Sequence, residues 1–461
     1  MPVVWGCYHA EEPSTGDRHD SSFLIKPMYQ IAIYLYLLGV AVYSCFNEKV
    51  RKMWRGEREA IDTLKQKVDP NAKYVWFHAA SLGEFEQGRP LMEQLRHDHP
   101  EYKILLTFFS PSGYEVRKGY EGADIITYLP LDTIRNARRF LRAVRPVMAF
   151  FIKYEFWYNY LHILKHRGVP VYSVSSIFRP GQVFFRWYGR QYSRVLKCFT
   201  HFFVQNEQSR DLLASIGITD VSVVGDTRFD RVLQIKSAAK QLTIVEDFLK
   251  ASPENSIADR PVKVFVAGSS WEPDEDVYLP YFTENRNWKL IVATHVVSRQ
   301  RIEILKKRLK AFGLSCVCYT DLEAAASVKR QDGIADASPA NGSLSANVLL
   351  VDCYGLLSSI YQYGDVAYVG GGFGVGIHNI LEAAVWQMPV IFGPNNQRFQ
   401  EAQDLKAAEG GFEVGNAADF QRVMRRLEDA DCIEKSGRAA GEYVESRAGA
   451  TRLVLAETLP S

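Results

Sequence analysis

The stretch "YVWFHAASLGEFEQGRPLMEQLR", residues 74–96, joins an apolar run, a turn of small residues and a polar segment. The run Tyr74–Ala79 has the length of a buried strand, and the segment after Gly83 reads as a helix. The same alternation of apolar runs and polar helical stretches continues along the chain from Lys73. Runs that are apolar throughout predict parallel strands covered by helices on both faces.

The apolar runs fall into two sets, and 461 residues are more than a single core usually holds. The runs of the first set are YVWFHA, KILLTFF, DIITYLPL, PVMAFFI, PVYSVSS, HFFVQN and VSVVG, and those of the second are KVFVAGSS, KLIVATH, SCVCYT, NVLLVD, VAYVGGG and PVIFGP. The fold class is therefore α/β, with two Rossmann-like, doubly wound parallel-sheet domains. We place the domains at residues 47–240 and 262–461, with a linker at 241–261, and we read 323–347 as a mobile surface insertion.

Residues 28–46, "MYQIAIYLYLLGVAVYSCF", contain no charged side chain and have just the length that a helix needs to cross a bilayer. We predict a membrane-anchor helix here, preceded by a disordered leader at residues 1–27. The basic segment that follows places the rest of the chain on the cytosolic side. A buried or interfacial helix is the alternative interpretation. The segment 178–194 interleaves arginines with aromatic residues, which suits a membrane surface or, alternatively, a helix with solvated charges.

Composition excludes other classes. A net charge of +2 gives no signal for nucleic-acid binding. The seven cysteines form no CxxC pair or Cys/His ligand set, which favours reduced thiols in a cytosolic setting and no metal or other cofactor.

In the second half, a strand, a glycine-rich turn and a helix follow each other in residues 366–393. The glycines do not fit G-x-G-x-x-G, and no Walker lysine is present. We expect Asn379 to cap the helix, with the backbone from Asn379 through Ile380 to Leu381 meeting a phosphate. Glu382 either closes a capping box or accepts hydrogen bonds from a ribose.

Three other loops of this half follow strands and complete a predicted nucleotide-binding crevice. They contribute Ser269, then Thr294 and His295, then Gly355, Leu356 and Leu357. The "DED" at 274–276 matches a metal-binding D-x-D pattern, but its position at a helix start favours capping.

The first half carries a carboxylate, Glu84, near the start of a helix. A helix start stabilises the ionised form, which could accept a proton from an attacking hydroxyl. Alternatively Glu84 is an ordinary surface acid. Glu155 and Arg228 also lie at strand ends. An arginine can stabilise charge on a leaving phosphate, or it can belong to a structural ion pair.

These motifs, in this order, resemble the 3-deoxy-D-manno-octulosonic acid (Kdo) transferases of lipopolysaccharide biosynthesis. The resemblance rests on the anchor, "HAASLGE", "KYEFWYN", "VQNEQSRDLL", "GDTRFDRV", "GGGFGVGIHNILEAA" and "PVIFGPNNQRFQEA". It implies the GT-B architecture, in which two Rossmann-like domains face a cleft. It also implies a CMP-Kdo donor, lipid IVA (a lipid A precursor) as acceptor, and a place at the bacterial inner membrane with the catalytic domains in the cytoplasm.

By that resemblance Glu84 accepts the proton, and Glu155 and Arg228 stabilise the transition state. CMP meets Thr294, His295, Gly355–Leu357 and Asn379–Glu382. Many members have Pro-Arg at Ala293-Thr294 and Lys at Arg228. The predicted reaction is an inverting, metal-independent Kdo transfer. The alternatives are a GT-B transferase or epimerase that uses a UDP-sugar, and a non-catalytic membrane tether that binds a nucleotide or lipid.

Overall fold

The computed structural model describes residues 22–189, 191–251, 262–331 and 345–459. Most of the predicted leader, residues 252–261 of the predicted linker and 332–344 of the predicted insertion lie outside these ranges. The chain divides into two compact units. The first comprises Met1–Phe85 and Leu95–Val223, and the second comprises Glu86–Gln94 and Val224–Ser461.

The first unit contains a seven-stranded sheet in the order β3-β2-β1-β4-β5-β6-β7. All its strand pairs are parallel. The strands are β1 (Lys73–Ala79), β2 (Tyr102–Phe108), β3 (Ile125–Tyr128), β4 (Met148–Ile152), β5 (Val171–Ser176), β6 (His201–Val204) and β7 (Val221–Val223). The helices are α1 (Ser22–Tyr43), α2 (Glu48–Lys67), α3 (Leu82–Asp98), α4 (Pro111–Arg117), α5 (Ile134–Val144), α6 (Tyr158–His166) and α7 (Glu207–Ser215), with short 3-10 turns at Val183–Phe185, Trp187–Gly189 and Tyr192–Cys198.

The second unit repeats this plan with the order β10-β11-β9-β8-β12-β13-β14, again parallel throughout. Its strands are β8 (Lys263–Ser270), β9 (Trp288–Thr294), β10 (Cys316–Cys318), β11 (Val348–Val351), β12 (Val366–Val369), β13 (Val390–Phe392) and β14 (Gly411–Glu413). Its helices are α8 (Thr227–Ser237), α9 (Thr243–Lys250), α10 (Glu272–Glu284), α11 (Arg299–Ala311), α12 (Tyr319–Gln331), α14 (Leu357–Ile360), α15 (Leu381–Ala384), α16 (Gln400–Ala407), α17 (Ala417–Arg426), α18 (Ala430–Ser446) and α19 (Ala450–Thr458), with a 3-10 turn at Tyr361–Tyr363.

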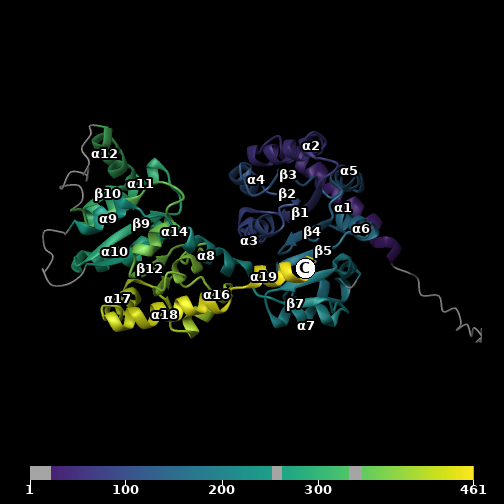
Figure 1. The fold of residues 1–461 in the computed structure, drawn as a ribbon. Helices are drawn as coiled ribbons and strands as arrows, with labels where there is room; N and C mark the ends of the chain where they lie inside the picture. Colours follow the sequence, from purple (N-terminus) through teal and green to yellow (C-terminus); the bar gives the residue numbers. More distant parts are fainter. Residues whose placement is uncertain (1–21, 190, 252–261, 332–344, 460–461) are drawn as a thin grey trace, which may run out of the picture. The chain divides into compact units, whose positions relative to one another are not determined.

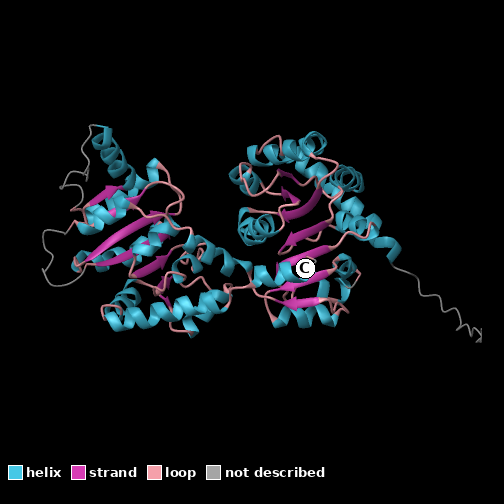
Figure 2. Cartoon of the chain, viewed as in Figure 1, coloured by secondary structure: helices cyan, strands magenta, loops and turns pink. Residues whose placement is uncertain are grey.

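Burial explains why both sheets are parallel and covered. Strands β4, β5 and β9 are buried at every residue, and β1 is buried at every residue but the first. In each unit the strands lie between helices (Figure 2). Aromatic side chains fill much of the space between strand and helix, as where Trp76 packs against Phe140, Phe151 and Tyr160. Full burial of one such ring contributes about 1.5–3 kcal/mol. The predicted pair of doubly wound sheets is confirmed.

Helix α1 covers most of the predicted segment 28–46, but it begins at Ser22, within the predicted disordered leader, and ends at Tyr43. The prediction that it spans a membrane is not supported. Within the part of the chain that the structure describes, no helix is both long and apolar enough to cross a bilayer. The reason is visible in its polar residues. Tyr29 donates a hydrogen bond to Asp132 at 2.6 Å, and Gln30 donates one to Asn159 at 2.7 Å. These contacts hold α1 against its own unit, at the loop after β3 and the start of α6 (Figure 1).

Candidate functional site

Strand order marks one edge of the first sheet as the place for a site. From β1 the chain continues to β2 and β3 on one side, then returns to β4 on the other side of β1. Such a reversal opens a crevice beyond the carboxyl ends of the two central strands. Glu84 follows β1, and Glu155 follows β4. The fold therefore brings these two predicted residues to the same edge.

Glu84 caps helix α3 through one carboxylate oxygen and leaves its other oxygen open. The backbone N–H of Ser81 donates to its Oε2 at 2.9 Å, and the Ser81 hydroxyl lies 3.4 Å from the same oxygen. The first of these contacts is one half of a capping box at the start of α3, and the other half is the Ser81 side chain facing the backbone N–H of Glu84. Its other oxygen, Oε1, accepts no hydrogen bond from the residues that the structure describes. Since the side chain is only partly buried, this oxygen can still receive a proton.

The surroundings of Glu84 act against the stabilisation of its ionised form that the helix start was predicted to give. Burial raises the pKa of Glu84, and the negative charge of Glu155 raises it further. His78, the N–H of Ser81 and Lys153 lower it, but they do not outweigh the first two effects. A raised pKa makes the ionised carboxylate a stronger base at neutral pH.

Glu155 behaves in the opposite way because two N–H groups hold it. Trp157 Nε1 donates to its Oε2 at 2.6 Å, and His78 Nε2 lies 3.1 Å from the same oxygen. Burial by itself would raise the pKa of Glu155, but the hydrogen bonds and the charge of His78 lower it below the ordinary value. The pKa of Glu84 is thus raised and that of Glu155 lowered, although both lie at one sheet edge. Such a difference is typical of sites that divide roles between two acids.

His78 and Trp157 were not predicted as site residues. His78 is fully buried at the end of β1, and its Nδ1 lies 2.9 Å from the Thr107 hydroxyl on β2. An ionised carboxylate only accepts hydrogen bonds, so the His78 nitrogen that faces Glu155 carries the proton. The sequence offered one signal for each residue, since Trp157 lies two positions after Glu155 and His78 is the one polar side chain in the apolar run before Glu84.

In the second unit the predicted nucleotide residues also share one edge. Strands β11, β9, β8 and β12 are neighbours in that order and run parallel. The residues predicted to contact the nucleotide lie in the last residues of these strands or in the segments that directly follow them. The reversal of strand order falls at β8, between β9 and β12, so Ser269 and the loop at Asn379 flank the switch point. Ser269 has a left-handed backbone (φ 52°), a conformation that non-glycine residues adopt mainly where function requires it.

The loop after β12 differs from the prediction in its helix. Asn379 is not the N-cap, because α15 begins only at Leu381 and ends at Ala384. The Asn379 side chain instead accepts from the Leu381 N–H at 3.2 Å and donates to Glu382 Oε1 at 3.0 Å. Because Ile380 and Leu381 point into the core, only their backbones can meet a ligand. Burial raises the pKa of Glu382.

The remaining predicted contacts are open to solvent to different degrees. Thr294 is buried, and its hydroxyl donates to the Val296 carbonyl at 3.0 Å, whereas His295 is exposed. Gly355 is exposed with a left-handed backbone (φ 88°), and Leu356 is the N-cap of the single-turn helix α14. The structure thus supplies the edge that was predicted.

Arg228 lies in the first turn of α8, which packs against both α14 and α15. Its Nε donates to Asp226 Oδ2 at 2.8 Å, and one terminal nitrogen donates to Glu401 Oε1 at 2.9 Å. The ion pairs raise its pKa, against the effect of burial, so the guanidinium stays charged. The ion pairs of the structural interpretation are therefore present, and the second terminal nitrogen has no hydrogen-bond partner among the described residues.

The acids of the D-x-D pattern serve the fold, as their position favoured. Asp274 is fully buried and accepts hydrogen bonds from Trp271 N–H (2.9 Å), Gly371 N–H (3.0 Å) and the Tyr368 hydroxyl (2.9 Å). Asp276 pairs with Arg308. Among the described residues, no three His, Cys, Asp or Glu side chains come together as a metal site would require.

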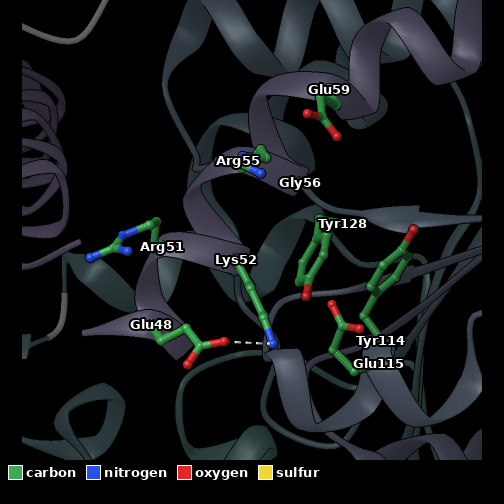
Figure 3. Close-up of a pocket in the computed structure, with 9 residues that line it drawn as sticks. All are labelled: Glu48, Arg51, Lys52, Arg55, Gly56, Glu59, Tyr114, Glu115 and Tyr128. Atoms are coloured by element: carbon green, nitrogen blue, oxygen red, sulfur yellow. Dashed lines mark ion pairs between the residues drawn. The ribbon is translucent and has the colours of Figure 1, made fainter. Parts of the chain in front are cut away.

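A separate hollow of about 420 Å³ lies between α2 and α4 in the first unit (Figure 3). Its lining mixes the acids Glu48, Glu59 and Glu115 with the bases Arg51, Lys52 and Arg55. Glu48 and Lys52 pair at 3.0 Å. None of the predicted site residues lines it, and its mixed charges favour no single ligand.

Comparison with known proteins agrees with the motifs. Residues 54–231 match the family described as 3-deoxy-D-manno-octulosonic-acid transferase (kdotransferase). A 3-deoxy-D-manno-octulosonic acid transferase from Aquifex aeolicus is 26% identical over 383 residues, which cover 80% of this chain and 92% of the relative. The chain is a relative of the Kdo transferases. It is accordingly an enzyme, a glycosyltransferase.

A second relative is longer than the chain. The bifunctional glycosyltransferase/methyltransferase of Fusobacterium nucleatum is 25% identical over 405 residues, which span 85% of this chain and 58% of that protein.

Among solved structures, the UDP-GlcNAc 2-epimerase of Neisseria meningitidis bound to UDP-GlcNAc matches with a TM-score of 0.55 and 14% identity. The match covers 83% of this chain and 99% of that one. This likeness is one of fold, and it agrees with two Rossmann-like domains of the GT-B kind.

Proposed function

We propose that this glycosyltransferase moves Kdo from CMP-Kdo to lipid IVA, with inversion and without a metal. The observation that carries the proposal is the position of Glu84 in a relative of the Kdo transferases. Its Oε1 is free of protein hydrogen bonds, and its pKa is raised by burial and by Glu155. The predicted cleft, which both Rossmann-like domains face, stays part of this proposal.

Glu84 acts as the general base. As the acceptor hydroxyl attacks the anomeric carbon of Kdo, its proton passes to Oε1 of Glu84. The bond between that carbon and the CMP phosphate oxygen breaks on the opposite side, and CMP leaves with the electron pair. Positive charge grows on the sugar ring in such a transition state. Glu155 supplies fixed negative charge there, because Trp157 and His78 keep it ionised.

The second unit binds the nucleotide through the edge formed by β11, β9, β8 and β12. Backbone N–H groups from Asn379 to Leu381 and the charge of Arg228 stabilise the phosphate as CMP leaves. A single phosphate needs less neutralisation than a diphosphate, which supports a mechanism that uses the protein's own cation. Transfer should therefore persist in EDTA.

The acceptor is a lipid, so we place the enzyme at the cytoplasmic face of the inner membrane. Support comes from exposed apolar side chains on α1, where Ile31, Leu35 and Leu38 are all at least 61% exposed at helical spacing. Trp187 and Tyr188 of the predicted basic-aromatic surface are exposed as well, at 89% and 64%. Phe178 and Phe184 of the same segment are buried and belong to the core.

Incubation of the purified chain with CMP-Kdo and lipid IVA tests the proposal, with the product mass recorded. A mass increase by one or more Kdo units is expected, together with release of CMP. UDP-GlcNAc in place of CMP-Kdo is the matched control, and CMP, not UDP, should raise the Tm. Turnover of the UDP-sugar with no Kdo transfer would overturn the donor assignment.

A further inference from the structure

Three aromatic side chains form a compact cluster at the switch point of the second sheet. Trp271 follows β8, His295 follows β9, and His378 lies in the loop after β12. Trp271 Nε1 donates a hydrogen bond to His378 Nε2 at 3.1 Å, and the angle between the two ring planes is 10°. The His295 ring stacks on both, with centroids 4.8 Å from Trp271 and 4.1 Å from His378.

The hydrogen bond determines which nitrogen of His378 carries the proton. An indole N–H only donates, so Nε2 of His378 must present its lone pair. The neutral imidazole then bears its single proton on Nδ1. Burial lowers the pKa of His378 to about 4, and the neighbouring His295 lowers it as well. The ring is therefore neutral at physiological pH.

Buried hydrogen-bond partners hold the cluster in this arrangement. Asp274 accepts the backbone N–H groups of both Trp271 and Gly371, which ties the two loops together. Gly371 has a left-handed backbone (φ 97°), and a Cβ there would lie 3.0 Å from the His378 ring. The position thus needs glycine for its conformation and for the close approach of the imidazole. Residues that hold a ring this firmly are typical of a pre-organised site.

The free side of His378 is available to a ligand. No residue in the described ranges is hydrogen-bonded to its Nδ1, and the side chain is only half-buried. His378 also directly precedes Asn379, where the proposed function places the phosphate.

We propose that Trp271 positions His378 as a neutral Nδ1–H donor, and that this N–H binds a phosphate oxygen of the nucleotide. The inference rests on the proposed function for the identity of the nucleotide. Neither residue was among the predicted contacts. A neutral donor binds the phosphate by a hydrogen bond without adding a charge that would have to be desolvated.

The tautomer is tested without any ligand. In the full-length chain with ¹⁵N-labelled histidine, long-range ¹H–¹⁵N correlation at pH 7 distinguishes the two neutral forms and the cation. His378→Gln assigns the signal by its loss. The Nδ1–H form is expected in the wild type, and Trp271→Phe should lose this preference. An Nε2–H form or a cation in the wild type would overturn the positioning role of Trp271.

Binding is tested with a matched pair of substitutions. The amide N–H of His378→Asn lies near the position of Nδ1, whereas His378→Gln places its amide near Nε2. CMP affinity, measured by calorimetry, should fall at least about 10-fold in His378→Gln and recover in His378→Asn, since a hydrogen bond to a charged group is worth about 1.5–3 kcal/mol. Cytidine, which lacks the phosphate, should bind both variants like the wild type.

The outcomes separate the two proposals. Equal CMP affinity of wild type and His378→Gln would refute the donor role while leaving Kdo transfer intact. Equal losses for CMP and cytidine would refute the contact with phosphate. If the wild type bound UDP but not CMP, the proposed donor would be wrong, and the spectra would still decide the tautomer.

Discussion

The two sheets reverse their strand order in the same way, yet their switch points differ in charge. Beyond β1 and β4 lie two carboxylates, whereas beyond β9 and β12 lie two stacked imidazoles, the second of them in a glycine-rich loop. Each place uses an indole N–H. Trp157 donates to Glu155, and Trp271 donates to His378.

The two indoles select opposite protonation states by one physical rule. A donor stabilises whichever form of its partner can accept. For Glu155 that form is the charged carboxylate, and for His378 it is the neutral imidazole. One edge is therefore suited to proton removal beside fixed negative charge. The other is suited to binding an anion through N–H groups.

The largest expected effect comes from removing the base. Glu84→Gln should lower kcat for Kdo transfer by about 10² to 10⁴-fold, the usual contribution of general base catalysis. CMP affinity should stay unchanged, because the proposed CMP site lies in the second unit. Transfer rates are measured from product mass, and affinity by calorimetry.

Glu93→Gln is the matched control for this change. Glu93 lies on the same helix and pairs with Arg89 at 2.6 Å, away from the predicted site residues. Its replacement should leave kcat within about twofold, since ion pairs four residues apart in one helix contribute little. A Glu84→Gln enzyme with wild-type turnover would mean that Glu84 does not accept the proton.

Trp157→Phe should lower kcat less than Glu84→Gln does. Without the indole N–H, the pKa of Glu155 rises, and the carboxylate is protonated at a higher pH. We expect kcat near neutral pH to fall by about 10-fold, the value of one hydrogen bond to a charged group. The acid limb of the pH–rate profile should also move to higher pH. An unmoved limb would indicate that the ionisation of Glu155 does not govern the rate.

Arg228→Lys should have a smaller effect on the anion-binding edge. Lysine keeps the charge, but it cannot reach both Asp226 and Glu401 in the geometry of a guanidinium. A rise in KM for CMP-Kdo of about threefold is expected, with kcat little changed. Arg228→Met removes the charge and the ion pairs with both acids, so its loss must be larger. Equal losses in the two variants would assign Arg228 to structure alone.

Strand patterns predicted both sheets, and the strand-end rule then located Glu84, Glu155 and the nucleotide edge. These patterns could not show which side chain, distant in sequence, each of these residues contacts. His78 reaches Glu155 across 77 residues, and Trp271 reaches His378 across 107. The sign of the Glu84 shift was missed for the same reason, because burial and Glu155 are properties of the folded sheet edge. The lack of charged residues in 28–46 predicted a membrane span and gave no sign that Tyr29 binds Asp132 and Gln30 binds Asn159.

The smallest effect, on stability, separates catalysis from folding. The folded-state pKa of Glu84 is raised above 4.5, so its stabilising effect is full below that pH and is lost as the pH rises through the folded value. Gln can close the same capping box with Ser81, but it carries no charge to desolvate. Glu84→Gln should therefore raise the Tm at pH 8 by about 2 °C, and the difference should vanish at pH 4. Calorimetry at both values measures this. A Tm that fell at pH 8 would show that the ionised carboxylate stabilises α3 more than its burial costs, and the raised pKa would then no longer support Glu84 as a strengthened base.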